Sequence, residues 1–355
     1  MDKKKISDTR IDFSKVLLTP QDIKDKLPLS DEAKRTVLQG RQEIENIIDG
    51  KDSRKFIVVG PCSIHDVNLA KEYAQKLKKI ADKVKDKLLL VMRVYFEKPR
   101  TTVGWKGFIN DPDMDDSFKI NKGLLLARKL LLEIAELGLI TGTEALDPIT
   151  PQYISELVSW AAIGARTIES QTHREMASGL SMPVGFKNGT DGNIKVAFEA
   201  MQASRTPHSF LGINILGQVS ILNTKGNPYG HIILRGGGGK PNFEPKTIQW
   251  VEENLNKLNL PPKIVIDCSH GNSNKDHTKQ AFVLETVIQQ ILDGDTAIIG
   301  MMLESNLNEG NQKIPSDISK LKYGVSVTDK CIGWEETEKI ILAAYEKLSI
   351  SGQSE

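Results

Sequence analysis

Short apolar runs alternate with amphipathic stretches along most of the chain. The run KFIVVG at 55–60 is typical of a buried strand, and the stretch 68–84 that follows it has apolar residues at helical spacing. The same alternation continues to a closing helix at 335–348. It predicts eight strands, centred near residues 57, 91, 140, 167, 185, 232, 265 and 299.

Eight strands that alternate with helices predict parallel βαβ units, and eight such units fit a closed (β/α)8 barrel of the TIM type. A doubly wound open sheet is the alternative, but no G-x-G-x-x-G motif follows the first predicted strand. The length of 355 residues would by itself also allow two domains. The alternation favours a single barrel domain over residues 51–355.

Two segments interrupt the alternation. Residues 1–50 are polar, with helical patterns at 19–26 and 30–49, and we expect an N-terminal extension that packs on the barrel or on a neighbouring subunit. Residues 208–230 are instead typical of strands joined by turns, which predicts a β-hairpin inserted before the sixth strand. Around the fourth strand, Thr150 and the proline after it predict a helix over 150–160, and the strand itself is expected at 165–169.

Composition narrows the classes of function. With 47 basic and 46 acidic residues the formal net charge is +1, so the chain lacks the basic surplus of a protein that binds nucleic acid or an anionic membrane surface. No apolar run approaches a membrane span of about 20 residues, and the first ten residues lack the apolar core of a signal peptide. Three widely spaced cysteines do not form a disulfide framework. We therefore expect a cytoplasmic protein whose cysteines are free thiols or metal ligands.

One stretch, VMRVYFEKPRTTVGWKG at 91–107, begins as an apolar run and ends in cations and hydroxyls. Arginine offers a planar fork and lysine a point charge, and both bind phosphate. A single basic loop is as often only a solvated surface loop. Whether this stretch forms a site depends on whether residues from other strands converge on it.

Chemically capable residues follow every predicted strand, at the end of a (β/α)8 barrel that carries the active site. Five are cations that would repel one another across one cavity unless a multiply charged anion is bound there: Arg93, Lys98, Arg166, Lys187 and Arg235. A second set mixes a thiol, an imidazole and two carboxylates: Cys62, His270, Glu304 and Asp329. Such a set suits Mn²⁺, Fe²⁺, Co²⁺ or Zn²⁺ better than Mg²⁺ or Ca²⁺. Taken singly, each of the four also has a structural explanation, such as a small buried side chain for the cysteine.

Eight sequence blocks resemble the type I family of 3-deoxy-D-arabino-heptulosonate 7-phosphate (DAHP) synthases, which catalyse the first step of the shikimate pathway. The resemblance covers the chain from about residue 5 to 350 and keeps the order of the blocks. The blocks are GPCSIHD at 60–66, RVYFEKPRTTVGWKG at 93–107, GARTIESQTHRE at 164–175, GFKNGT at 185–190, ILRGG at 233–237, DCSHGNSNK at 267–275, ESNLNEGNQ at 304–312 and YGVSVTDKCIGW at 323–334.

The resemblance implies a transferase of aromatic amino acid and chorismate biosynthesis that condenses phosphoenolpyruvate with D-erythrose 4-phosphate and water. It implies one divalent metal ion (Mn, Fe, Co or Zn), and the family's metal ligands match Cys62, His270, Glu304 and Asp329. The five cations match the groups that hold the phosphate and carboxylate of phosphoenolpyruvate, while Arg100 and Thr101 match the binder of the aldose phosphate. Lys98 is our candidate proton donor and His270 a second candidate. One local departure is the glycine run 236–239, which is longer than the family pattern leads us to expect after Arg235.

Enzymes of this type are commonly inhibited by an aromatic amino acid bound away from the active site. The resemblance implies an effector pocket that includes Asp147, Pro148, Gln152, Ser181, Phe210 and Gly212. Glycine at position 212 is expected in tyrosine-sensitive forms and serine in phenylalanine-sensitive ones, because the tyrosine hydroxyl needs the space of the serine side chain. We therefore expect tyrosine as the effector, with phenylalanine as the alternative, and a homodimer or homotetramer.

Two other functions fit part of the pattern. A related synthase uses arabinose 5-phosphate and makes an eight-carbon sugar acid, but the KPRTT block and the long N-terminal extension weigh against it. A sugar-phosphate-binding protein on a barrel scaffold would explain the cations. It would not explain a metal-type set of side chains beside them.

Overall fold

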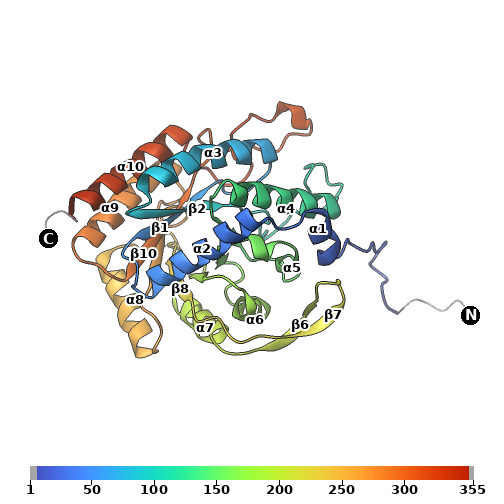
Figure 1. Cartoon of the computed structure of the whole chain (residues 1–355), viewed down its shortest axis with the longest axis horizontal. Helices are drawn as coiled ribbons and strands as arrows, with labels where there is room; N and C mark the ends of the chain where they lie inside the picture. The colour runs from blue at the N-terminus through green and yellow to red at the C-terminus, as the bar shows by residue number, and fades with distance from the viewer. Residues whose placement is uncertain (1–5, 352–355) are drawn as a thin grey trace, which may run out of the picture.

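The computed structural model describes residues 6–351, and its centre is a closed barrel of eight parallel strands (Figure 1). Neighbouring strands follow the order β1-β10-β9-β8-β5-β4-β3-β2, and β2 pairs with β1 to close the ring. This confirms the predicted (β/α)8 barrel. The strands are β1 Lys55–Gly60, β2 Leu88–Arg93, β3 Thr141–Glu144, β4 Trp160–Ile163, β5 Val184–Lys187, β8 Gly230–Leu234, β9 Ile264–Asp267 and β10 Ile298–Glu304.

Helices surround the barrel and connect its strands (Figure 1). Side chains alternate along β1, so that Ile57 and Val59 pack in the core towards the helices, whereas Phe56 and Val58 belong to the core inside the barrel. The surrounding helices are α3 Val67–Val84, α4 Ile120–Glu136, α5 Pro151–Ile154, α6 Gln171–Gly179, α7 Lys195–Ser204, α8 Pro245–Lys257, α9 Gln280–Leu292 and α10 Trp334–Ser351, with short 3-10 helices at Ser155–Leu157, His277–Lys279 and Ile318–Lys320.

The N-terminal helices lie outside this alternation. Helix α1, Pro20–Lys26, begins with a capping box between Thr19 and Asp22, and α2 is Asp31–Ile48. Gly40 of α2 packs so closely on Ile140, just before β3, that an added Cβ would lie 2.3 Å from the Ile140 side chain. Helix α2 therefore covers the amino-terminal end of the barrel, opposite the end expected to carry the active site. The first five residues of the predicted extension lie outside the described residues.

The prediction was wrong around the fourth strand. Helix α5 ends at Ile154, a single 3-10 turn follows, and the strand is β4 at Trp160–Ile163 rather than 165–169. The run Trp160-Ala-Ala-Ile continues the apolar pattern of the preceding helix, and a short apolar run is ambiguous between helix and strand. Because the strand ends earlier than predicted, Arg166 lies in the loop that follows β4 rather than within the strand.

The predicted hairpin is confirmed as a separate two-stranded antiparallel sheet of β6 Ser209–Ile213 and β7 Val219–Asn223 (Figure 1). Its tip reaches the N-terminal extension, since Gln21 N donates to Ile215 O at 2.9 Å. Its cross-strand pair Leu211 and Ile221 is 77% and 70% exposed, which is unusual for large apolar side chains. Within residues 6–351, no helix is long and apolar enough to cross a membrane.

Candidate active site at the carboxyl end of the barrel

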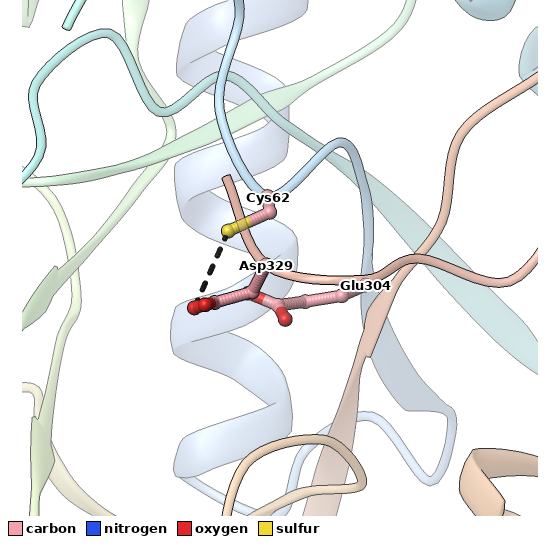
Figure 2. Close-up of side chains that lie close together, drawn as sticks. All are labelled: Cys62, Glu304 and Asp329. Carbon is pink, nitrogen blue, oxygen red and sulfur yellow. Dashed lines mark hydrogen bonds between the residues drawn. The ribbon is translucent and has the colours of Figure 1, made fainter. Parts of the chain in front are cut away.

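A thiol and two carboxylates from distant parts of the chain meet at the carboxyl end of the barrel (Figure 2). The potential ligand atoms of Cys62, Glu304 and Asp329 all lie within 4.8 Å of one another, and Cys62 Sγ is 3.7 Å from Asp329 Oδ2. Glu304 ends β10 beside Gly60 of β1, so the strand register brings it next to the loop that carries Cys62. Thr328 and Ser63 share a 2.8 Å hydroxyl hydrogen bond that ties the loop of Asp329 to the loop of Cys62. Sequence positions far apart thus form one compact group.

His270 lies beside this group without belonging to it. Its Nε2 is 3.8 Å from Glu304 Oε1, and its Nδ1 is 2.9 Å from Asp267 Oδ2. The residue has a φ of 53°, in the left-handed region that non-glycine residues rarely adopt. Lys275 N donates to His270 O at 2.7 Å, which helps to hold this turn after β9. The imidazole is therefore fixed at one nitrogen and faces the carboxylate of Glu304 with the other.

Two of the predicted cations contact the thiol and carboxylate group directly. Arg93 is 1% exposed, donates to Glu304 Oε1 at 3.2 Å, and lies with its guanidinium carbon 3.9 Å from the ring centre of Tyr95. Its NH1 has no hydrogen-bond partner among the described residues. Lys98 Nζ lies 3.2 Å from both Cys62 Sγ and Cys62 O. Arg93 and Lys98 therefore supply positive charge to the same group.

The other three predicted cations come from the opposite side of the mouth. Lys187 Nζ is 2.8 Å from Asp267 Oδ2, and both side chains are buried. Arg235 is 8% exposed, whereas Arg166 is exposed. Burial lowers the pKa of the Arg235 guanidinium, the charge of Asp267 opposes this, and the nearby charge of Arg166 lowers the pKa further. Arg166 and Arg235 thus repel each other in the same region, as expected of a site for an anion.

Cys62 and the neighbouring Lys98 have shifted pKa values. Burial and the neighbouring charge of Glu304 raise the pKa of the Cys62 thiol to about 11, although Lys98 and Arg93 act in the opposite direction. Burial lowers the pKa of Lys98, but the charges of Cys62, Glu304 and Asp329 raise it by more, and the net pKa lies above its ordinary value. Lys98 is therefore held as an ammonium next to an acidic cluster.

Arg100 and Thr101 lie on the outer part of the loop after β2. Both are exposed, and Arg100 donates from Nε to Trp105 O at 2.8 Å. The bridge between Glu97 and Gly107 closes the base of this loop. An added Cβ on Gly107 would lie 2.3 Å from Phe96 O, so the close approach of the two strands requires glycine there. Arg100 and Thr101 are not part of the group formed by Cys62, Glu304 and Asp329.

A network of three buried asparagines connects the loops after β5, β8 and β9. Asn188 Oδ1 accepts from Arg235 N at 2.9 Å and from Asn242 Nδ2 at 3.1 Å. Asn242 N donates to Asn272 Oδ1 at 2.8 Å, and Asn272 Nδ2 donates to Asp267 O at 2.9 Å. The network was not predicted, because an asparagine near a glycine is also typical of any turn. It holds the loops of Lys187, Arg235 and His270 at fixed positions.

The sequence also left Asp267 out of the predicted site. It ends β9 as Glu304 ends β10, so the rule that selected Glu304 would have selected it as well. Its carboxylate is fully buried and accepts from Lys187, His270 and Ser269. Burial raises the pKa of Asp267, but the charges of His270 and Lys187 hold it well below the usual value. It is the central acceptor on this side of the mouth.

The residues predicted for an effector pocket lie around α5, α6 and the hairpin. Asp147 lines a small hollow, together with Glu97, Thr150, Pro151 and Leu180. The remaining five lie just before α5, within it, after α6 and in β6: Pro148, Gln152, Ser181, Phe210 and Gly212. The base of the hairpin reaches α6, since the hydroxyls of Ser178 and Thr224 are 2.6 Å apart.

Comparison with known proteins identifies the family of this chain. Residues 26–342 match the model of the DAHP synthetase I family. A tyrosine-sensitive phospho-2-dehydro-3-deoxyheptonate aldolase from Salmonella typhimurium is 54% identical over 98% of this chain and 98% of its own length. A phenylalanine-sensitive one from Escherichia coli is 55% identical over 94% and 95%. The solved structure of such an aldolase from Francisella tularensis SCHU S4 is 51% identical, covers 96% of this chain and 99% of its own, and superposes with a TM-score of 0.93.

Proposed function

This chain belongs to the DAHP synthetase I family, and we propose that it condenses phosphoenolpyruvate with D-erythrose 4-phosphate and water to DAHP and phosphate. This reaction opens the shikimate pathway of aromatic amino acid biosynthesis. The observation that carries the proposal is the meeting of cations from both sides of the barrel mouth with a thiol, an imidazole and two carboxylates. A site for an anion therefore lies directly beside a set of metal-type ligands.

The cations suit a substrate with two anionic groups. We assign the phosphate and carboxylate of phosphoenolpyruvate to Arg93, Lys98, Arg166, Lys187 and Arg235. Burial of most of these cations strengthens their attraction to an anion, because the local dielectric constant is low. Arg100 and Thr101, on the exposed loop, are assigned to the phosphate of erythrose 4-phosphate, which enters from the solvent side.

The donor set fits a single divalent ion. We assign four ligands to this ion: Cys62, His270, Glu304 and Asp329. The potential ligand atoms of Cys62, Glu304 and Asp329 already lie within 4.8 Å of one another. The fourth residue, His270, faces the carboxylate of Glu304 with its Nε2. A mixture of sulfur, nitrogen and oxygen donors favours Mn²⁺, Fe²⁺, Co²⁺ or Zn²⁺. When bound, such an ion supplies a Lewis acid for the aldehyde oxygen of erythrose 4-phosphate.

The protein side chains have separate tasks in the reaction. C3 of phosphoenolpyruvate bonds to the aldehyde carbon, water adds at C2, and phosphate leaves by C–O cleavage. Lys98 is assigned the delivery of a proton to the new alkoxide, because its raised pKa keeps it charged beside Cys62. His270 is the second candidate for this role. Arg93 offers its unpartnered NH1 to the substrate anion from a fixed position over Tyr95.

We assign feedback inhibition by tyrosine to a pocket around Asp147, Pro148, Gln152, Ser181, Phe210 and Gly212, with phenylalanine as the alternative effector. The small hollow lined by Asp147 lies in the same region, beside α5. The extension 1–50 and the hairpin are assigned to regulation and to contacts between subunits of a homodimer or homotetramer. The exposed apolar residues Leu211, Val219 and Ile221 support the assignment of subunit contacts, because a monomer would leave them in water.

The substrates are tested by measuring phosphate release from phosphoenolpyruvate with either erythrose 4-phosphate or arabinose 5-phosphate. Turnover with the four-carbon sugar alone supports the proposal, turnover with the five-carbon sugar indicates the related synthase, and binding without turnover indicates a sugar-phosphate-binding protein. Stripping the enzyme with EDTA should abolish turnover, and adding Mn²⁺ should restore it. Full activity in EDTA would refute the metal assignment.

The effector is tested by inhibition assays with tyrosine, phenylalanine and tryptophan. Replacing Gly212 by Ser should shift the preference from tyrosine towards phenylalanine. An added Cβ at position 212 would lie 2.4 Å from Leu222 Cδ1, so a packing change is expected from any side chain there. Gly212→Ala is therefore the matched control, since it adds the same Cβ without the hydroxyl. An equal shift in both variants would assign the effect to the added Cβ and its packing on Leu222 rather than to the serine hydroxyl.

A further inference from the structure

We propose that Asp267 is a positioning residue that couples the binding of the divalent ion to the binding of phosphoenolpyruvate. The inference rests on the function proposed above. It concerns a residue that touches neither the assigned metal ligand atoms nor the substrate directly, and acts through Lys187 on one side and His270 on the other.

The geometry of the carboxylate makes it a shared acceptor. A single oxygen, Oδ2, lies 2.8 Å from Lys187 Nζ and 2.9 Å from His270 Nδ1. The other oxygen, Oδ1, accepts from Ser269 Oγ at 2.5 Å and from Ser269 N at 3.0 Å. The side chain is 0% exposed. With four donors around it and no access to water, the carboxylate cannot rotate without leaving a buried donor unpaired.

The shared acceptor determines which nitrogen of His270 is free. Ser269 Oγ donates its own hydrogen to Asp267 Oδ1, so towards His270 it can act only as an acceptor. His270 Nδ1 therefore carries the hydrogen and donates to Ser269 Oγ and to Asp267 Oδ2. Neutral imidazole then carries its lone pair on Nε2, the nitrogen that faces Glu304. A carboxylate on the far nitrogen also makes the lone pair more basic, and losing such a partner typically weakens metal affinity by about 10- to 100-fold.

The same carboxylate also forms an ion pair with Lys187. Lys187 Nζ is paired with Asp267 Oδ2, so an incoming phosphate must compete with this carboxylate. A cation at His270 Nε2 polarises the ring and strengthens the hydrogen bond from Nδ1–H to Asp267. More of the carboxylate charge is then committed to the imidazole, and Lys187 is more available to an anion. Each ligand thus improves the site for the other, as linkage requires.

The test is isothermal titration of metal-stripped protein with Mn²⁺ and with phosphoenolpyruvate, each alone and in the presence of the other. In the unaltered protein, Mn²⁺ should tighten phosphoenolpyruvate binding by at least about fivefold. Asp267→Asn should weaken Mn²⁺ binding by about 10- to 100-fold. It should leave phosphoenolpyruvate binding to the metal-free protein equal or tighter and reduce the coupling to below about twofold. A residue with only a structural role would weaken both ligands together.

Two further variants make the result decisive. Asp293→Asn removes an exposed carboxylate that accepts from Gln289, and it should leave both affinities unchanged. Ser269→Ala keeps the Asp267 carboxylate but removes one donor that holds it, so the coupling should fall by at least about twofold even if Asp267→Asn does not fold. The inference is overturned if the unaltered protein shows no coupling, if Asp267→Asn binds Mn²⁺ within twofold of it, or if Ser269→Ala keeps the full coupling.

Turnover separates this inference from the proposed function. The same preparations are assayed for phosphate release with erythrose 4-phosphate. If the unaltered protein turns over substrate but shows no coupling, only the proposed role of Asp267 is refuted. Unaltered protein that binds both ligands cooperatively yet releases no phosphate sinks the proposed reaction instead.

Discussion

A buried histidine beneath the active site should make the barrel sensitive to mild acid. His231 is fully buried inside the barrel, where its Nε2 accepts a hydrogen bond from Trp160 Nε1 at 3.0 Å. Its Nδ1 lies 3.4 Å from Tyr229 O, and the ring of Phe56 meets it edge-on. Protonation of Nε2 would place two N–H groups against each other at the Trp160 contact. Burial accordingly lowers the pKa of His231 to about 4.

The sign and size of the effect follow from the two pKa values. The pKa is 6.5 in the unfolded chain and about 4 in the native barrel, so between these values the unfolded chain binds one more proton. The free energy of unfolding must therefore fall as the pH falls through this window. At about 1.4 kcal/mol per pH unit the full loss is about 3 kcal/mol, of which about 2.5 kcal/mol has occurred by pH 4.5.

The assay compares urea unfolding of the unaltered protein and His231→Gln from pH 7.5 to 4.5, followed by circular dichroism at one protein concentration. Glutamine offers a carbonyl to Trp160 but does not titrate. Carboxylates that titrate in the same window are common to both proteins and cancel in the difference. The stability of His231→Gln relative to the unaltered protein should therefore rise by about 2.5 kcal/mol across the range. Parallel curves would refute the argument that His231 is held neutral by burial.

Three further outcomes are expected. Burial and the charge of Asp147 raise the pKa of Glu97 to about 8. The free energy of unfolding should therefore fall by about 4 kcal/mol as the pH rises from 4.5 to 8, and Glu97→Gln should abolish this dependence in the same unfolding assay. Lys98→Arg keeps the charge, but arginine holds its proton too tightly to deliver it. The kcat should therefore fall by about 10²- to 10⁴-fold, while the Mn²⁺ affinity measured by titration stays within about threefold. A kcat within tenfold of that of the unaltered protein would assign proton delivery to another group. An added Cβ on Gly237 would lie 2.3 Å from Gly192 N, so Gly237→Ala should lower the free energy of unfolding by about 1–3 kcal/mol and raise the KM for phosphoenolpyruvate. Gly333→Ala is the control and should be neutral, because the atom nearest to its added Cβ would be 3.4 Å away.

The barrel could be predicted because its signal is repeated. Each short apolar run lies between two amphipathic helices, so an error in one strand leaves the count of eight intact. The fourth strand shows this. Its apolar run at Trp160 directly follows an apolar helix, and local pattern could not separate the two. The boundary was decided instead by tertiary pairing, in which Gly142 of β3 lies opposite Trp160 of β4.

The candidate site was predictable only in part, for a physical reason. A residue after a barrel strand must lie near the mouth, and this placed Cys62 and Glu304 correctly in space. Which of these residues touch depends on side-chain direction and loop course, which sequence spacing does not contain. Lys187 and Asp267 are 80 positions apart, yet their charged atoms are 2.8 Å apart. The asparagine network depends in the same way on three loops that meet only in the folded chain.

The cations at the mouth are held by contacts that bound ligands would have to replace. Arg93 is paired with Glu304, and Lys98 lies against Cys62, so two cations assigned to the anion are held by two groups assigned to the metal. A divalent ion held by Glu304 and Cys62 would take over the carboxylate charge that now pairs with Arg93 and the sulfur that now contacts Lys98. Arg93 and Lys98 would then be free to attract an anion, and their attraction would be strong because water screens charges weakly at this site. The mouth therefore favours binding both ligands over binding either one, and Asp267 extends the same exchange of partners to Lys187 on the opposite side.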